Sequence, residues 1–135
     1  GIGFSRANLF GKHFEDYTKE AQSPLLVAMI ENISAIENLE EILTVDGLDA
    51  IFIGPYDLSA SMGLTARFED PEFISCMKVI CEKSKEYKVP YGIHIVKPDS
   101  NKLKQSIKEG YQFIAYSIDS VILSEYAALP INLEN

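Results

Sequence analysis

The most constraining feature of this sequence is the regular alternation of short apolar segments with longer amphipathic ones. Near-continuous apolar runs predict strands at residues 25–30, 48–53, 91–96 and 113–116. Runs of this kind are typical of parallel strands that are covered on both faces. Between and after them, apolar residues recur at the helical period, which predicts helices over residues 35–43, 70–87, 100–109 and 121–129. This order predicts a parallel α/β sheet with right-handed crossovers.

The boundaries of these helices carry the expected signals. Asp70 can cap the second helix and Pro71 suits its first turn, while Gly47 and Gly110 lie just past the ends of the first and third. Residues 1–17 precede the first strand, and we interpret them as the loop and helix that follow an earlier strand. The chain has no initiator Met, which suggests part of a longer product.

Four strand–helix units leave two architectures open. One is a small open α/β sheet, and the other is half of a (β/α)₈ barrel, a fold that typically needs about 250 residues where this chain has 135. No glycine-rich phosphate loop follows any predicted strand, which disfavours a nucleotide-binding open sheet. Periodicity alone does not decide between the two.

Composition excludes several classes of function. The formal charge is −8, from 20 acidic and 12 basic residues, and this disfavours a nucleic-acid partner because phosphate binding needs a basic surface. No apolar run reaches the roughly 18 residues of a membrane helix, and the first residues lack a signal peptide, so we expect a cytoplasmic protein. Cys76 and Cys81 are about 140° apart around a helix, which predicts free thiols rather than a disulfide or a zinc site.

Parallel α/β folds form their sites at the carboxyl ends of strands, so the residues that follow each strand are candidates. They are Glu31; Gly54, Pro55, Tyr56 and Asp57; His94, Lys97 and Asp99; and Ser117 and Asp119.

Glu31 and Asp57 are the candidate metal ligands. Each follows one of two neighbouring apolar strands, and a partly desolvated carboxylate needs a cation or a metal as partner. Two such carboxylates with waters are typical of a hard divalent-ion site. The alternative is that Glu31 caps the following helix and Asp57 caps its own loop.

The remaining candidates each have a structural alternative. Gly54 and Pro55 favour a turn in which the N–H groups of Tyr56 and Asp57 face an anion, although an ordinary turn fits equally. His94 can be a site residue or a satisfied polar residue of its strand. His13 is expected at the surface. Arg6 and Asn8 are candidates only if their loop reaches the carboxyl-end face.

Several segments of the sequence resemble the HpcH/HpaI aldolase family. The strand end Met29-Ile30-Glu31-Asn32 is the first, and the block Gly54-Pro55-Tyr56-Asp57-Leu58-Ser59, with Gly63 beyond it, is the second. The segment Ser5 to Gly11 also resembles the region that precedes these blocks in sugar-acid aldolases of the family. The resemblance covers nearly the whole chain.

This resemblance implies a (β/α)₈ barrel of the phosphoenolpyruvate/pyruvate class, of which the chain would form one domain, residues 1–135, with strands five to eight. It implies a class II aldolase that cleaves a 4-hydroxy-2-oxo acid to pyruvate and an aldehyde. It also implies a divalent ion (Mg²⁺, Mn²⁺ or Co²⁺) on Glu31 and Asp57, and a homo-oligomer, usually a hexamer with exchanged C-terminal helices. The implied substrate-binding residues are Met29, Gly54, Pro55, Tyr56, Asp57 and His94.

Three departures qualify what the resemblance implies. The family's proton-transferring His and enolate-stabilising Arg belong to a first half that this chain does not contain, so no catalytic residue is assigned to it. Met29 stands where the family often has Gln. Tyr56 and His94 replace a small residue and a Leu, which predicts a bulkier, more polar pocket and a different aldehyde partner.

Two other functions stay open. One is a carbon–carbon lyase of the citrate-lyase or malyl-thioester-lyase type, which needs an acyl-thioester pocket. The other is a non-catalytic half-barrel that pairs with itself or with a partner chain.

Overall fold

The computed structural model describes residues 3–127, except for the side chain of Tyr126. A short helical segment precedes four strands that alternate with helices. The elements are η1 (Arg6–Asn8), α1 (Phe14–Glu20), β1 (Val27–Ile30), α2 (Ile33–Glu37), α3 (Leu39–Leu43), β2 (Ala50–Ile53), α4 (Pro55–Ser61), α5 (Pro71–Glu86), β3 (Tyr91–Ile95), α6 (Ser100–Glu109), β4 (Phe113–Tyr116) and α7 (Asp119–Tyr126).

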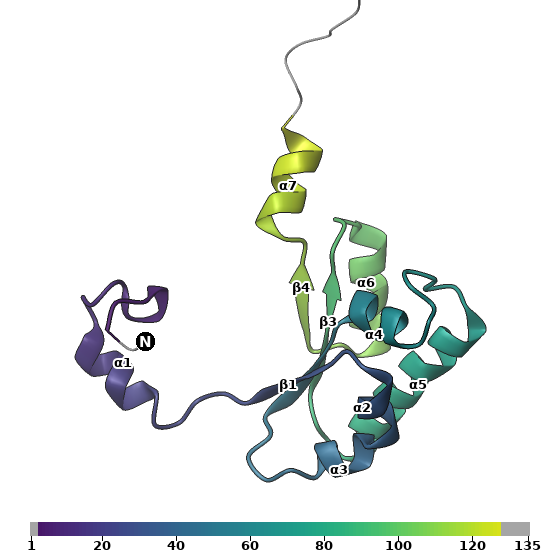
Figure 1. The fold of residues 1–135 in the computed structure, drawn as a ribbon, viewed down its shortest axis with the longest axis horizontal. Helices are drawn as coiled ribbons and strands as arrows, with labels where there is room; N and C mark the ends of the chain where they lie inside the picture. The colour runs from purple at the N-terminus through teal and green to yellow at the C-terminus, as the bar shows by residue number, and fades with distance from the viewer. Residues whose placement is uncertain (1–2, 128–135) are drawn as a thin grey trace, which may run out of the picture.

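The strands form one parallel sheet in the order β1-β2-β3-β4 (Figure 1). Right-handed crossovers that always advance in the same direction place the intervening helices on the same face of a sheet. A doubly wound open sheet instead reverses its strand order and is covered on both faces. The sequential order confirms the prediction of half a (β/α)₈ barrel.

The core lies between the sheet and its helices. Ile30, Ile51 and Ile53 point to this side from β1 and β2 and are almost completely buried. They pack in one cluster with Leu58 of α4 and Ile80 of α5, both fully buried. This face, which we call the helix face, holds the sheet and its helices together through burial of apolar surface.

The opposite face of the sheet, which we call the inner face, is open, so the prediction that the strands are covered on both faces was wrong for the described chain. Val27 and Met29 of β1 are 37% and 55% exposed. The inner face is exposed because the helices between the strands all pack on the opposite face of the sheet. In a (β/α)₈ barrel this face is covered by the strands across the barrel.

An aromatic pair partly covers the inner face. The rings of Phe52 and Phe113 stack with centroids 5.4 Å apart, although β3 lies between their strands. Gly92 of β3 is their register partner on both sides. A Cβ atom at Gly92 would lie 2.6 Å from the Phe113 ring, so the stack requires glycine there.

The structure corrects two predicted elements. The helix predicted over residues 35–43 is two helices, because Asn38 ends α2 and precedes α3 with a non-helical ψ of 20°. The turn predicted at Gly54-Pro55 begins a further helix, α4, which the sequence reading missed. Pro55 fits its first turn, where no N–H donor is needed.

The other predicted elements are confirmed, with small shifts at their ends. Strands β1 and β2 begin at Val27 and Ala50, each two residues later than predicted. Asp70 caps α5 by accepting a hydrogen bond from Glu72 N at 3.1 Å, as predicted. Helix α7 begins at Asp119, and its predicted end at Leu129 lies outside the described residues. Within residues 3–127, no helix combines the length and apolarity needed to cross a membrane.

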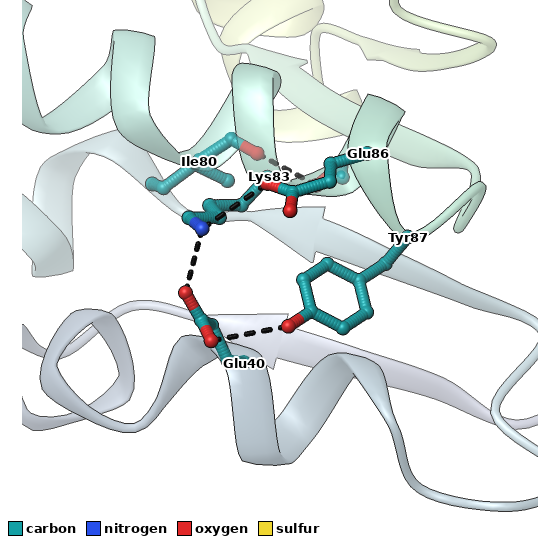
Figure 2. Close-up of polar contacts among 6 residues, drawn as sticks. Glu40, Ile80, Lys83, Glu86 and Tyr87 are labelled. Atoms are coloured by element: carbon teal, nitrogen blue, oxygen red, sulfur yellow. Dashed lines mark hydrogen bonds and ion pairs between the residues drawn. The ribbon is translucent and has the colours of Figure 1, made fainter.

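A polar cluster joins α3 to α5 on the outside of the fold (Figure 2). Lys83 Nζ lies 2.6 Å from Glu40 Oε1 and 3.1 Å from Glu86 Oε2, and the Tyr87 hydroxyl donates to Glu40 Oε2 at 3.1 Å. The hydrogen bond from Lys83, supported by that of Tyr87, lowers the pKa of Glu40 below its ordinary value. The hydrogen bonds to Glu40 and Glu86 raise the pKa of Lys83.

Candidate functional site

The ends of β1 and β2 bring Glu31 next to Gly54. Ile30 pairs with Ile53 in the parallel register, and Gly54 N donates to Ile30 O at 3.1 Å. A Cβ atom at Gly54 would lie 3.3 Å from Glu31 Cβ and 3.4 Å from Glu31 Oε2. The side chain of Glu31 therefore lies over Gly54, on the inner face of the sheet.

Helix α4 places Asp57 one turn beyond the end of β2. Gly54 is the N-cap, Pro55 is the first helical residue, and Asp57 lies in the first turn. The first intrahelical hydrogen bond runs from Leu58 N to Gly54 O, at 2.9 Å. The N–H groups of Tyr56 and Asp57 precede this bond, and such amides at a helix start are suited to a negatively charged group.

The capping alternative for Glu31 is wrong. Asn32 is the N-cap of α2, and its Oδ1 accepts from Ser34 N at 3.0 Å. Within residues 3–127, neither the Glu31 nor the Asp57 carboxylate has a hydrogen bond or ion pair, and both residues are exposed. Both carboxylates are thus accessible at adjacent strand ends.

Two serines of the same block fix the position of α4, and the sequence reading gave them no role. Ser61 Oγ accepts from Ile33 N at 2.9 Å and donates to Leu58 O at 2.7 Å, which ties the start of α2 to the last turn of α4. The fully buried Ser59 donates to Tyr56 O at 2.8 Å and accepts from Ala66 N at 3.1 Å. The only indication in the sequence was the position of Ser59 and Ser61 shortly after Gly54 and Pro55.

His94 lies on the inner face of β3 and is half-buried. Its Nε2 lies 3.3 Å from the carbonyl oxygen of Ser117, and its ring centroid lies 6.5 Å from that of Phe52. Ser117 is buried and has a left-handed backbone, with φ of 67°. The histidine is thus partly satisfied, as the structural alternative predicted, and it also faces the open side of the sheet.

Several other candidates have structural roles or lie elsewhere. Asp99 caps α6 by accepting from Asn101 N at 2.8 Å and Lys102 N at 3.0 Å, and these hydrogen bonds lower its pKa. Asp119 Oδ1 accepts from Ser120 N at 2.7 Å at the start of α7. Lys97 is exposed, and exposed Met29 faces the inner side of β1.

The N-terminal candidates do not reach this site. Figure 1 shows η1 and α1 apart from the sheet, so the condition set for Arg6 and Asn8 is not met. Asn8 is fully buried within its own loop, where Oδ1 accepts from Ser5 N and Gly11 N at 3.1 and 3.0 Å. His13 is exposed at the start of α1, as predicted.

The cysteines are free thiols, as predicted. Cys76 is buried in the core, and burial raises the pKa of its thiol. Cys81, on the same helix, is half-buried, and burial raises its pKa as well. Its Sγ donates to the Tyr111 hydroxyl at 3.4 Å.

The donor chemistry at the two strand ends fits a hard divalent ion. No group of three or more His, Cys, Asp or Glu side chains in the described part of the chain is arranged to hold a metal. Magnesium-type ions are, however, commonly bound through one or two carboxylates, with water and substrate oxygens in the other positions. Glu31 and Asp57 provide such a pair, and Gly54 leaves room beside Glu31.

Comparison with known proteins agrees with this fold and with the family resemblance of the sequence. A family model described as HpcH/HpaI aldolase/citrate lyase matches residues 6–125, and the chain belongs to this family. It is 35% identical over 122 residues to a hydroxypyruvate/pyruvate aldolase from Sagittula stellata, covering 90% of this chain and 47% of the relative. It is 32% identical over 126 residues to a 2-keto-3-deoxy-L-rhamnonate aldolase from Escherichia coli O1:K1, covering 93% and 46%.

A solved structure shows the same arrangement. The chain is similar to an HpcH/HpaI aldolase/citrate lyase family protein from Burkholderia cenocepacia J2315, with a TM-score of 0.75 and 26% identity. The similarity covers 93% of this chain and 48% of that one. The chain therefore spans about half the length of the relatives it matches.

Proposed function

We propose that this chain forms the metal- and pyruvate-binding half of a class II aldolase that cleaves a 4-hydroxy-2-oxo acid to pyruvate and an aldehyde. The observation that carries the proposal is the position of two accessible carboxylates, Glu31 and Asp57, at adjacent strand ends. The family membership supports a carbon–carbon lyase, and the named aldolase relatives support this type of reaction.

In this proposal, Glu31 and Asp57 hold Mg²⁺, Mn²⁺ or Co²⁺. The N–H groups of Tyr56 and Asp57 receive the carboxylate of pyruvate, and Gly54 and Pro55 shape the backbone that presents them. A bound divalent ion would act as a Lewis acid toward the 2-oxo group. Met29 and His94 line the inner face beside this position, where they contact the substrate.

The groups that move protons and stabilise the enolate oxygen are expected outside this chain, on the remaining strands of the barrel. The 135-residue chain alone should therefore not release pyruvate from a 4-hydroxy-2-oxo acid. A coupled lactate dehydrogenase assay with added Mg²⁺ or Mn²⁺ measures this directly. Sustained metal-dependent turnover by the purified chain would show that it contains catalytic residues of its own, contrary to this proposal.

The metal site itself is testable without turnover. Asp57→Asn removes one of the two proposed ligand charges, so it should weaken Mn²⁺ binding by at least about tenfold, because the hard cation loses an anionic oxygen donor. Electron paramagnetic resonance of free Mn²⁺ during titration gives the affinity. Asp46→Asn is the matched control, since Asp46 is an exposed carboxylate in the loop before β2. Equal Mn²⁺ affinity in both variants would refute the proposed site.

A further inference from the structure

The two proposed metal ligands lie on chain segments that are joined by two hydrogen bonds. The first is a backbone bond, in which Gly54 N donates to Ile30 O at 3.1 Å. In the second, Ile33 N donates to the hydroxyl oxygen of Ser61 at 2.9 Å. Each ligand lies between the two bonded residues of its own segment. The two bonds together therefore restrict how far one ligand can move relative to the other.

The hydroxyl group of Ser61 is used both as an acceptor and as a donor. Its oxygen accepts from Ile33 N, and its proton goes to Leu58 O at 2.7 Å. Ile33 is the first residue of α2, and the N–H groups in the first turn of a helix have no partner within that helix. The side chain of the N-cap Asn32 accepts from Ser34 N. Ser61 thus supplies the acceptor for Ile33 N from another helix.

The side of α4 that carries Ser61 also carries Asp57. The two residues are four positions apart in this helix, and side chains with that spacing lie on the same side. Since Ser61 contacts the start of α2, this side of α4 is directed toward the chain that follows β1. Glu31 belongs to that chain and lies two residues before Ile33. Of the two bonds between the segments, the Ser61 bond is the one that a side-chain substitution removes.

We propose that Ser61 is a positioning residue for the divalent-metal site, and that its bond to the start of α2 holds Glu31 and Asp57 at the separation that a shared ion requires. The inference rests on the proposed function, and it adds a residue that acts through the two ligands rather than by binding the ion itself. Without this bond, Ile33 N loses its acceptor and the start of α2 can move relative to α4. Ordering the two carboxylates around an ion then costs more of the binding free energy.

Ser61→Ala removes the hydroxyl and should weaken Mn²⁺ binding by about three- to tenfold, as the loss of one hydrogen bond allows. Ser61→Thr keeps the hydroxyl and should restore most of the affinity. Electron paramagnetic resonance of free Mn²⁺ gives the affinities, and circular dichroism of the same samples shows whether each variant is folded. Ser61→Cys, whose thiol accepts hydrogen bonds only weakly, should also weaken binding, and it replaces Ser61→Ala if that variant does not fold.

Ser34→Ala is the matched control. It removes another serine hydroxyl from the start of α2, one that donates to Asn32 Oδ1 at 2.9 Å, and it leaves the link to α4 intact. Its Mn²⁺ affinity should equal that of the unmodified chain. A loss as large as that of Ser61→Ala would show that any disturbance of α2 weakens the site, and would overturn the specific role of Ser61.

A double-mutant cycle separates positioning from a general loosening of the fold. With Asp57→Asn, one charged ligand remains, so its placement relative to the other position matters less. Ser61→Ala should then cause a smaller loss of Mn²⁺ affinity than it does in the unmodified chain. An equal loss in both backgrounds, or a folded Ser61→Ala chain with undiminished affinity, would overturn the positioning role and leave the proposed metal site standing. Failure of the unmodified chain to bind Mn²⁺ would refute the proposed function, and this inference with it.

Discussion

Gly92 shows how the absence of one side chain organises the inner face of the sheet. It allows Phe52 and Phe113 to stack at 5.4 Å across β3. The stack fills the part of this face nearest the middle of the strands, below the position shared by Glu31, Gly54 and His94. The aromatic pair thus lies on the inner face next to the strand ends that carry the proposed substrate contacts.

Gly92→Ala should destabilise the fold by about 1–3 kcal/mol, because overpacking forces the Phe113 ring to move. The added Cβ would lie 2.6 Å from that ring, well inside contact distance. Urea unfolding followed by circular dichroism gives the free energy of unfolding. Adding Phe113→Leu to Gly92→Ala should recover part of the loss. A fully stable single variant would show that Phe113 relaxes without cost.

At the scale of single residues, the sequence predicted which residues follow the strands better than it predicted their side-chain contacts. The rule that sites follow strand ends led directly to Glu31 and Asp57, because the apolar runs before them are unambiguous. This rule could not predict the contact between His94 and Ser117, since a serine in the sequence does not indicate a left-handed backbone at its position. The alternative role of Glu31 as a helix cap was wrong because Asn32, the next residue, is the better capping group.

Among the elements, the short helices were the difficult ones. Helix α4 has seven residues and starts at a Gly-Pro pair, so its signal resembles that of a turn. The apolar period across residues 35–43 continues through Asn38 and hides the break between α2 and α3. There the Asn38 side chain donates to Ser34 O at 2.8 Å, an example of local hydrogen bonding that competes with helix continuation.

The contact between α3 and α5 should make stability depend on pH in the acidic range. The pKa of Glu40 is lowered in the folded state from its ordinary value of 4.5, mainly by the hydrogen bond from Lys83. A carboxyl with a lowered pKa contributes stability above its unfolded-state pKa, and that contribution is lost as the pH falls through the folded value. Lys83→Gln should therefore be less stable than the unmodified chain at neutral pH.

Below pH 4.5 that difference should shrink, because Glu40 becomes protonated in both proteins. Urea unfolding across this pH range measures the effect. Lys78→Gln is the control, since it removes an exposed helix pair with Glu82 at 3.7 Å and leaves the link between α3 and α5 intact. A difference for Lys83→Gln that stays constant down to pH 3 would contradict the role of Glu40.

For the whole molecule, the open inner face and the two sheet edges determine behaviour in solution. Strands β1 and β4 each have a sheet neighbour on one side only within the described chain, and their unpaired backbone groups can pair with another strand. Exposed Val27 and Met29 on β1 add apolar surface beside one of these edges. Both features favour association over a stable monomer.

Size-exclusion chromatography with light scattering should therefore find the 135-residue chain in an associated form. Met29→Lys places a charge on the inner face, and it should shift the chain toward monomer. Ile74→Lys is a matched control on the outside of α5, where Ile74 is 50% exposed. A monodisperse monomer for the unmodified chain would contradict the expected association.

The buried thiol of Cys76 makes α5 a reporter of local unfolding. Thiol reagents react with the thiolate, and burial both raises the pKa of Cys76 and keeps its sulfur away from solvent. Labelling of Cys76 therefore requires α5 to move away from the sheet. The rate at which a disulfide reagent consumes this thiol, compared with the rate for half-buried Cys81 on the same helix, thus measures how often the helix opens.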